Sequence, residues 1–289
     1  GPWLKGRVKE VPSADTLVLV AGGAGGPEKR IGVAGVVAPR LGRRDGSTPD
    51  EPFAWGAREW LREKCIKKEV VFRVDYTTQG GREYGTVFLG QENLAVGLVA
   101  AGWAKAREER KPAKDAEGQG QAASAMKAAE EAAQAAQRGM WDPAAKAGAV
   151  RAVPPAEDGA GAALLQSLGG AGCKVQAVVE QVGAGHVVRV TLLPTFHFLP
   201  VFIAGAHCPS VGRRPAPDSD QPGTPAEPMG PEAKRFTEAA VLGSKVELQL
   251  VGTDKFGNLF GTLSFRDARD AVQDLGEQLL GLGLGRAGG

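Results

Sequence analysis

Three arginines follow a proline at the end of an apolar run, in the stretch VAGVVAPRLGRRDG. Arg40, Arg43 and Arg44 come after Pro39, and we call residues 39–46 the arginine loop. A guanidinium group offers several N–H donors and no acceptor, so it holds phosphate oxygens but cannot take up a proton. The loop therefore fits three interpretations: part of a catalytic site, a grip on a polyanion, or a solvated turn.

Further basic residues gather near the predicted strands in both halves of the chain. Lys5, Arg7 and Lys9 alternate along the first predicted strand, and this spacing places all three on one face. The remaining candidates for contacts with a phosphate backbone are Lys29, Arg30, Arg82, Arg107 and Arg110 in the first half, and Arg189, Arg213, Arg214 and Lys255 in the second. Exposed basic residues also aid solubility alone, and that alternative stays open for each of them.

The composition describes a globular chain without an overall polycationic character. Its 289 residues suffice for two domains, and the formal net charge of +2 means that any basic surface must arise from local clustering. Cys65, Cys173 and Cys208 are odd in number and far apart, which predicts no disulfide framework and favours a reducing compartment. Because no apolar run approaches the roughly 20 residues of a membrane-spanning helix, we expect no membrane span.

The chain repeats itself at a nearly constant offset. Each matching pair has the same character: a strand, turn and strand; a strand ending before proline; a helix running into a strand; and an aromatic-glycine turn. In order, the pairs are 8–20 with 179–191, 31–40 with 201–210, 57–74 with 233–250, and 82–90 with 254–263. Four ordered matches predict two copies of one domain.

Each copy is predicted to contain three strands, a helix, two strands and one or more helices, and the Ala-rich stretch 119–141 is predicted as the longest helix. This layout is typical of a five-stranded barrel of the OB type, so we expect an α+β, mainly β fold with two tandem barrels and C-terminal helices. The predicted boundaries are 1–143 for the first domain, 144–162 for a flexible linker rich in small residues, and 163–289 for the second domain. The second domain is expected to be truncated at its C-terminal helices.

Several motifs resemble a known family. The turns GREYG and DKFGN, the segment TPDEPFAWGAREWLREK and the ending RGMW are similar to the first two domains of the Tudor staphylococcal nuclease family. The resemblance implies OB-type barrels within a longer chain that carries further nuclease-like and Tudor domains. It also implies RNA as a partner, single-stranded or structured, together with proteins of silencing complexes and other ribonucleoproteins. The implied locations are the cytoplasm, stress granules and also the nucleus.

The same resemblance allows the parent nuclease site to be checked residue by residue. That site uses Ca²⁺ held by two carboxylates, a glutamate near the attacking water and two arginines that stabilise the transition state. The first metal carboxylate is matched by Asp15 in the first copy and replaced by His186 in the second. The other positions hold Gly32, Val37, Arg40 and Thr86 in the first copy, and Phe202, His207, Ser210 and Asn258 in the second. With one match in ten positions, we predict two degenerate sites and no catalytic residues of the parent type.

Two points about metals remain open at this stage. Asp15 alone supplies too few oxygen ligands for Ca²⁺, so we expect it to cap its own turn instead. His186 and His207 take both carboxylate positions of the second copy, with Cys208 adjacent, and these three are candidate Zn²⁺ ligands. The alternative is that they are ordinary, half-buried polar residues. We expect no cofactor, and Ca²⁺ only if the chain is a nuclease.

Three functions follow from these observations. The preferred hypothesis is a non-catalytic module that binds RNA and serves as a scaffold in RNA silencing, RNA stability and stress granules. The first alternative is an endoribonuclease acting on structured or inosine-containing RNA. The second alternative is a platform for protein interactions that does not bind RNA. The degenerate sites argue against the nuclease, and the basic residues argue for RNA binding. The tryptophans of the predicted helices are interpreted as packing residues.

Overall fold

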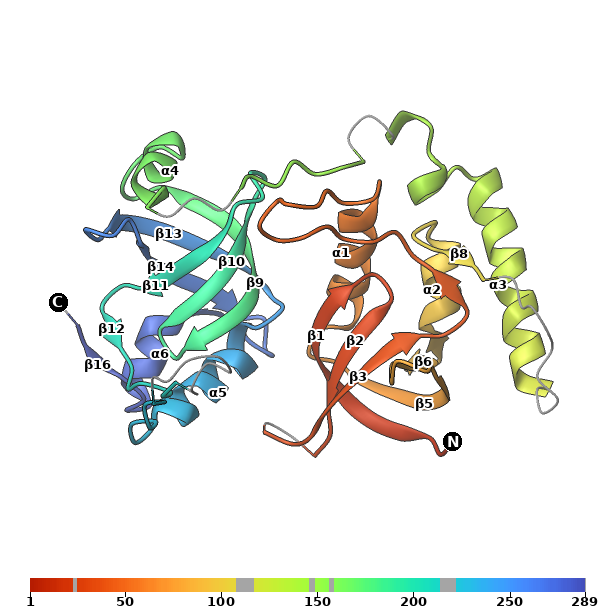
Figure 1. Cartoon of the computed structure of the whole chain (residues 1–289), viewed down its shortest axis with the longest axis horizontal. Coiled ribbons are helices and arrows are strands. Elements are labelled where there is room, and N and C mark those ends of the chain that lie inside the picture. Colours follow the sequence, from red (N-terminus) through yellow and green to blue (C-terminus); the bar gives the residue numbers. More distant parts are fainter. Residues whose placement is uncertain (23–24, 108–116, 146–148, 156–158, 214–221, 289) are drawn as a thin grey trace. The chain divides into compact units, whose positions relative to one another are not determined.

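The computed structural model describes residues 1–22, 25–107, 117–145, 149–155, 159–213 and 222–288, with the backbone alone at 117–119. The chain forms two compact units, each of which is a β-barrel with helices around it (Figure 1). The first unit comprises Gly1–Arg43 and Ser47–Ala152, and the second comprises Arg44–Gly46 and Val153–Gly289. The predicted fold class, two tandem five-stranded barrels with helices, is confirmed.

The first barrel is built from five principal strands and one helix between the third and fourth of them. In chain order these are β1 (Leu4–Ser13), β2 (Thr16–Val20), β3 (Glu28–Val33), α1 (Ala54–Cys65), β5 (Glu69–Thr77) and β6 (Glu83–Leu89). The smaller elements are β4 (Val36–Val37), β7 (Glu92–Asn93), α2 (Leu94–Ala100), β8 (Lys105–Ala106), α3 (Glu117–Ala135) and the 3₁₀ turn η1 (Gly139–Trp141).

One parallel pairing closes the first barrel. The strands follow the order β3-β2-β1-β5-β6, and β3 then pairs with β6 in parallel, with Gly32 opposite Tyr84 and Val33 opposite Gly85. This pairing covers part of the edges of β3 and β6, which reduces the chance of unwanted strand pairing. Gly85 of β6 also lies close to the neighbouring strand β5, because a Cβ atom there would collide with the carbonyl oxygen of Arg73.

The second barrel repeats this topology. Its main elements are β9 (Lys174–Ala184), β10 (Val187–Leu193), β11 (Phe198–Ile203), α5 (Gly230–Val241), β13 (Lys245–Thr253) and β14 (Leu259–Arg266). The smaller elements are α4 (Gly161–Ser167), β12 (Ala206–His207), β15 (Val272–Asp274), α6 (Leu275–Gly281) and β16 (Arg286–Ala287). Parallel pairing of β11 with β14 closes this barrel in the same way.

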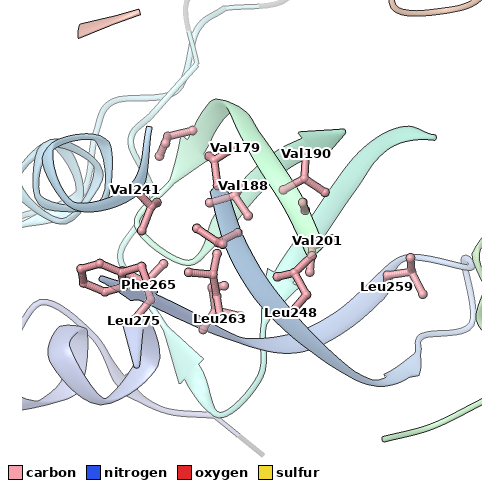
Figure 2. Packing of buried hydrophobic residues seen from close by; sticks show 14 of the residues in the cluster. Val179, Val188, Val190, Val201, Val241, Leu248, Leu259, Leu263, Phe265 and Leu275 are labelled. Carbon is pink, nitrogen blue, oxygen red and sulfur yellow. The ribbon is translucent and has the colours of Figure 1, made fainter. Parts of the chain in front are cut away.

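Alternating apolar residues fill each barrel. In the second barrel the strands point valines and leucines inward, and Val241 of α5 and Leu275 of α6 pack against the same core (Figure 2). In the first barrel Leu61 and Cys65 of α1 are fully buried against the strands. Burial raises the pKa of the Cys65 thiol to about 12, so this cysteine stays protonated and packs as an apolar residue.

The segment predicted as a flexible linker is partly anchored. Within the first unit, the Ala149 carbonyl accepts a hydrogen bond from the Phe53 N–H. The buried Arg151 side chain donates from Nε to Asp50 Oδ2 at 2.6 Å and lies over the Trp55 ring. These contacts hold residues 149–151 in place, and the composition of small residues does not reveal them.

Two helices differ from the sequence-based expectation. The helix predicted over 119–141 ends at Ala135, and the ending RGMW forms a separate 3₁₀ turn. The helix α4 was not predicted, because it begins at Gly161 inside a stretch rich in glycine and alanine. Its Leu164 and Leu165 are buried in the core of the second barrel. No helix in the described ranges is both long and apolar enough to cross a bilayer.

We expect Leu248→Ala to lower the free energy of unfolding of the second unit by about 2–5 kcal/mol, since it leaves a cavity in a packed core. Val251→Ala is the matched control, because Val251 lies on the same strand but is exposed, and it should cost about 1 kcal/mol or less. Urea unfolding followed by circular dichroism measures both. Equal effects of the two substitutions would contradict the inward register of β13.

Candidate nucleic-acid interface

Backbone hydrogen bonds show that the positions compared with the parent nuclease site are equivalent in the two barrels. The Val33 N–H donates to the carbonyl of Asp15, and the Ile203 N–H donates in the same way to the carbonyl of His186. Asp15 and His186 are therefore equivalent positions. After the strand-end prolines, the Arg40 N–H donates to Glu51 Oε2 at 2.8 Å and the Ser210 N–H donates to Glu227 Oε2 at 2.6 Å.

Asp15 binds its own turn. Its Oδ1 accepts hydrogen bonds from the Ser13 hydroxyl at 2.8 Å and from the Thr16 hydroxyl at 3.1 Å. These two bonds hold the carboxylate between the hydroxyls of its neighbours in the turn. Among the described residues, no group of three or more histidines, cysteines, aspartates or glutamates has the arrangement to hold a metal ion.

At the two positions where the parent pattern has arginine, the first barrel has a glycine and a threonine. Gly32 stands at the first, and the ring of Tyr84 lies so close that a Cβ atom on Gly32 would be 2.5 Å from it. Thr86 stands at the second, and its hydroxyl donates to Asp75 Oδ2 at 2.7 Å. Asp75 also accepts from Arg73 Nε at 3.0 Å. Both positions are thus occupied by packing or by a local polar network.

In the second barrel the histidine pair is held by the backbone. His186 Nδ1 accepts a hydrogen bond from the Cys208 N–H at 3.1 Å, and the rings of His186 and His207 are 4.7 Å apart. Burial raises the pKa of the Cys208 thiol, which disfavours the thiolate that zinc requires. Within the described residues these three side chains do not form a three-ligand metal site. Asn258 donates to Asp254 Oδ2 at 2.8 Å and closes its own turn.

Two carboxylates shape the arginine loop from outside. Glu51 accepts from the Arg40 N–H, and Asp50 Oδ1 accepts from the Gly42 N–H at 2.7 Å. Asp50 is itself paired with Arg151. The loop backbone is therefore fixed, while the side chains of Arg40 and Arg43 are exposed.

The predicted basic residues of the first half divide into paired and unpaired groups. Lys5, Lys9 and Lys29 form exposed or half-buried ion pairs with Glu69, Glu28 and Glu83, and such surface pairs hold a side chain only weakly. Among the predicted residues that the structure describes, those that are exposed and have no carboxylate within ion-pair distance are Arg7, Arg30, Arg40, Arg43, Arg82 and Arg107. Arg110 lies outside the described residues.

Arg44 does not share the freedom of its neighbours. It is grouped with the second unit, where its guanidinium lies 3.5 Å from Glu180 Oε2 and 5.3 Å from the centroid of the Phe198 ring. The carboxylate of Glu180 is buried, so this contact competes with phosphate binding. Of the three arginines of the loop, Arg44 is therefore the one whose side chain already has a charged partner.

Three of the four predicted basic residues of the second barrel lie in the described part of the chain. Arg189 lies over the Phe198 ring at 6.0 Å, and Lys255 lies over the exposed Phe256 ring at 5.0 Å. Arg213 is exposed, and its backbone pairs with Thr224. Arg214 lies outside the described residues. Lysine or arginine beside an exposed aromatic ring offers both charge and a stacking surface.

The sequence-based search for stacking residues weighed the tryptophans and missed two other aromatic pairs. Tyr76 and Tyr84 stack at 5.2 Å with an interplanar angle of 10°, and Phe202 and Phe260 stack at 5.3 Å with an angle of 27°. The available signal was the aromatic residue of the GREYG turn. Its partner Tyr76 could be found only from the pairing of β5 with β6.

The second unit should lose stability as the pH falls. Burial, and then the nearby His207, lower the pKa of His186 below its usual 6.5, and burial lowers that of His197. Above pH 6.5 both groups are neutral in the folded and unfolded states. Below it the unfolded state binds protons first, so stability declines until the pH passes the folded-state pKa. His186→Asn keeps an acceptor for the Cys208 N–H and should make this decline shallower in urea titrations between pH 7.5 and 5. Identical pH profiles for both proteins would contradict this account.

Comparisons with known proteins agree with this geometry. A family profile described as "Staphylococcal nuclease homologue" matches residues 30–143 and 215–287. The chain is 39% identical to "Ribonuclease TUDOR 1" of Arabidopsis thaliana, over 98% of this chain and 32% of that protein. It is 35% identical to "Staphylococcal nuclease domain-containing protein 1" of Drosophila melanogaster, over 96% of this chain and 30% of that protein.

The chain therefore spans about a third of the length of these relatives. The profile match covers more than half of the chain, and the relatives carry the Tudor and staphylococcal nuclease names that the sequence motifs predicted. The chain belongs to the staphylococcal nuclease homologue family, in its Tudor staphylococcal nuclease branch.

Proposed function

We propose that this tandem of barrels binds RNA and does not hydrolyse it. The proposed contact surface, here called the basic rim, consists of the predicted arginines of the first barrel that are described, exposed and without a carboxylate within ion-pair distance: Arg7, Arg30, Arg40, Arg43, Arg82 and Arg107. One observation carries the proposal: the loop that would carry the catalytic glutamate instead holds Arg40 and Arg43, exposed on a fixed backbone. Guanidinium groups bind phosphate oxygens through two parallel hydrogen bonds. They cannot act as a general base, because they have no acceptor.

The electrostatics of the rim support binding over chemistry. A strand with a regular row of phosphates gains counterion-release free energy from each cation that it meets. Arg7 on β1, Arg30 on β3 and Arg82 in the β5–β6 turn add further exposed positive charge to this barrel. Asp15, the single matching carboxylate, is hydrogen-bonded within its own turn. Charge for holding phosphates is thus present, whereas a cluster of metal-binding oxygens is absent from the described residues.

The alternative function, a ribonuclease, has support in the names of the Arabidopsis relatives. Those names describe proteins about three times as long as this chain, so their activity can reside in parts outside it. If this tandem cleaves RNA, it does so with Ca²⁺ or with a set of catalytic residues that differs from the parent set. The reason is that the parent positions of the first barrel hold Gly32, Val37, Arg40 and Thr86. A preference for structured or inosine-containing RNA belongs to this alternative.

A third function is protein interaction without RNA. The salt dependence of RNA binding distinguishes the proposed function from it. Contacts with phosphates make the logarithm of the binding constant fall linearly with the logarithm of the salt concentration. Roles in RNA silencing, RNA stability and stress granules, and a location in the cytoplasm and the nucleus, are further proposals that rest on the family resemblance. They would add silencing-complex proteins as partners of the same module.

Arg40→Glu should weaken binding to single-stranded RNA about tenfold at 0.1 M salt and reduce the steepness of the salt dependence by about one unit, because it removes one phosphate contact. Fluorescence anisotropy at several salt concentrations measures both quantities. Lys127→Glu on α3 is the control, since it makes the same change of charge on an exposed helical residue of the same unit.

The control variant should bind nearly as well as the unaltered chain. Two results would reject the proposed grip. One is a flat salt response of the unaltered chain, and the other is an equal loss of affinity in both variants, which would indicate a diffuse effect of net charge.

A further inference from the structure

Three neighbouring strand positions in each barrel hold two stacked aromatic rings and one glycine. In the first barrel the row crosses β3, β6 and β5 as Gly32, Tyr84 and Tyr76, because Gly32 pairs with Tyr84 and Tyr84 pairs with Tyr76. In the second barrel the equivalent row crosses β11, β14 and β13 and consists of Phe202, Phe260 and Gly252. The order of ring and glycine is thus reversed. The stack is thus present in both barrels, with the glycine at opposite ends.

In the first barrel the glycine end is filled and the tyrosine end is open. The Tyr84 ring lies over Gly32 and leaves no space for a Cβ atom there. Tyr76 stacks on Tyr84 with nearly parallel rings, yet its side of the stack is 43% exposed. One ring face of Tyr76 meets Tyr84, and among the described residues no second aromatic ring stacks on the other face.

The second barrel keeps its stack in a different setting. Phe202 lies near His186, with ring centroids 6.4 Å apart, and His186 lies against His207. Phe202 and Phe260 are each half-buried. The open tyrosine face of the first barrel has no equally exposed counterpart in this pair, so the inference concerns the first barrel.

We infer that the outer face of the Tyr76 ring is a stacking site for one unpaired nucleobase. This inference rests on the proposed binding of RNA and names a subsite within it. Every nucleobase has a flat π-face, and stacking on aromatic side chains is how barrels of this type hold single strands without reading their sequence. The substrate class is therefore a single-stranded nucleic acid of any sequence.

The charges around Tyr76 suit a base with its phosphate. Burial raises the pKa of the Tyr76 hydroxyl, and the positive charge of Arg107 opposes that shift, so Arg107 is close enough to act on this ring. The Asp75 side chain is only 7% exposed and is bound by Arg73 and Thr86, which offsets its negative charge. An incoming strand thus meets an apolar ring face and an exposed arginine.

The test compares two labelled RNA strands roughly 12 nucleotides long, within the span that one or two such barrels cover. One is oligouridine, and the other has the same phosphates but lacks bases at its central positions. The unaltered chain should bind the complete strand about tenfold more tightly than the abasic strand. Tyr76→Leu should abolish this preference without changing the salt dependence, and Tyr76→Phe should retain it because the ring remains.

Retention of the base preference in Tyr76→Leu would overturn the inference and leave the proposed RNA grip standing. Failure of the unaltered chain to bind either strand would overturn both. If Tyr76→Leu does not fold, as judged by its thermal transition, the unaltered chain decides the matter through photo-crosslinking with 5-iodouridine at the central position. Crosslinks to Tyr76 or Tyr84, located by mass spectrometry, support the site, and crosslinks elsewhere alone reject it.

Discussion

The parallel pairing that closes each barrel sets the geometry of the candidate site. The first barrel is closed by the pairing of β3 with β6 and the second by the pairing of β11 with β14. Both closing strands β6 and β14 carry a glycine, Gly85 and Gly261, where a Cβ atom would collide with a backbone carbonyl of the strand on their other side. The seam places Gly32 beside Tyr84 and brings the strand-end loops to one rim. A barrel that stays closed keeps this rim in shape even when the residues along it change.

We propose that the rim of the first barrel presents cations and flat rings where the parent nuclease accepts protons and binds metal. Where the parent pattern has carboxylates, the first barrel has Val37, 48% exposed, and Arg40. The carboxylates that remain nearby, Asp50 and Glu51, bind backbone N–H groups of the arginine loop. Their role is structural, because they fix the direction in which Arg40 and Arg43 project. The proposed binding of RNA without hydrolysis rests on this division of roles.

Much of the fold could be predicted from the repeated patterns, because alternating apolar residues and helical spacing are local signals. The aromatic rows could not, since Tyr76 and Gly32 meet only through the pairing of β5, β6 and β3. The anchoring of Arg151 on Asp50, a hundred residues earlier, has no local signal either. The basic residues were found by type, but their pairing was not. The contact of Arg44 with the buried Glu180 distinguishes it from Arg40, and only the tertiary structure shows that.

The central claim is that these two barrels hold RNA and leave it intact. The most direct measurement incubates the purified chain with end-labelled single- and double-stranded RNA, in Ca²⁺ and in EDTA, and follows complex formation and strand length in the same samples. The account predicts a salt-sensitive complex and full-length RNA under both conditions. Cleavage that requires Ca²⁺, is abolished by EDTA and persists at constant specific activity through purification would contradict it.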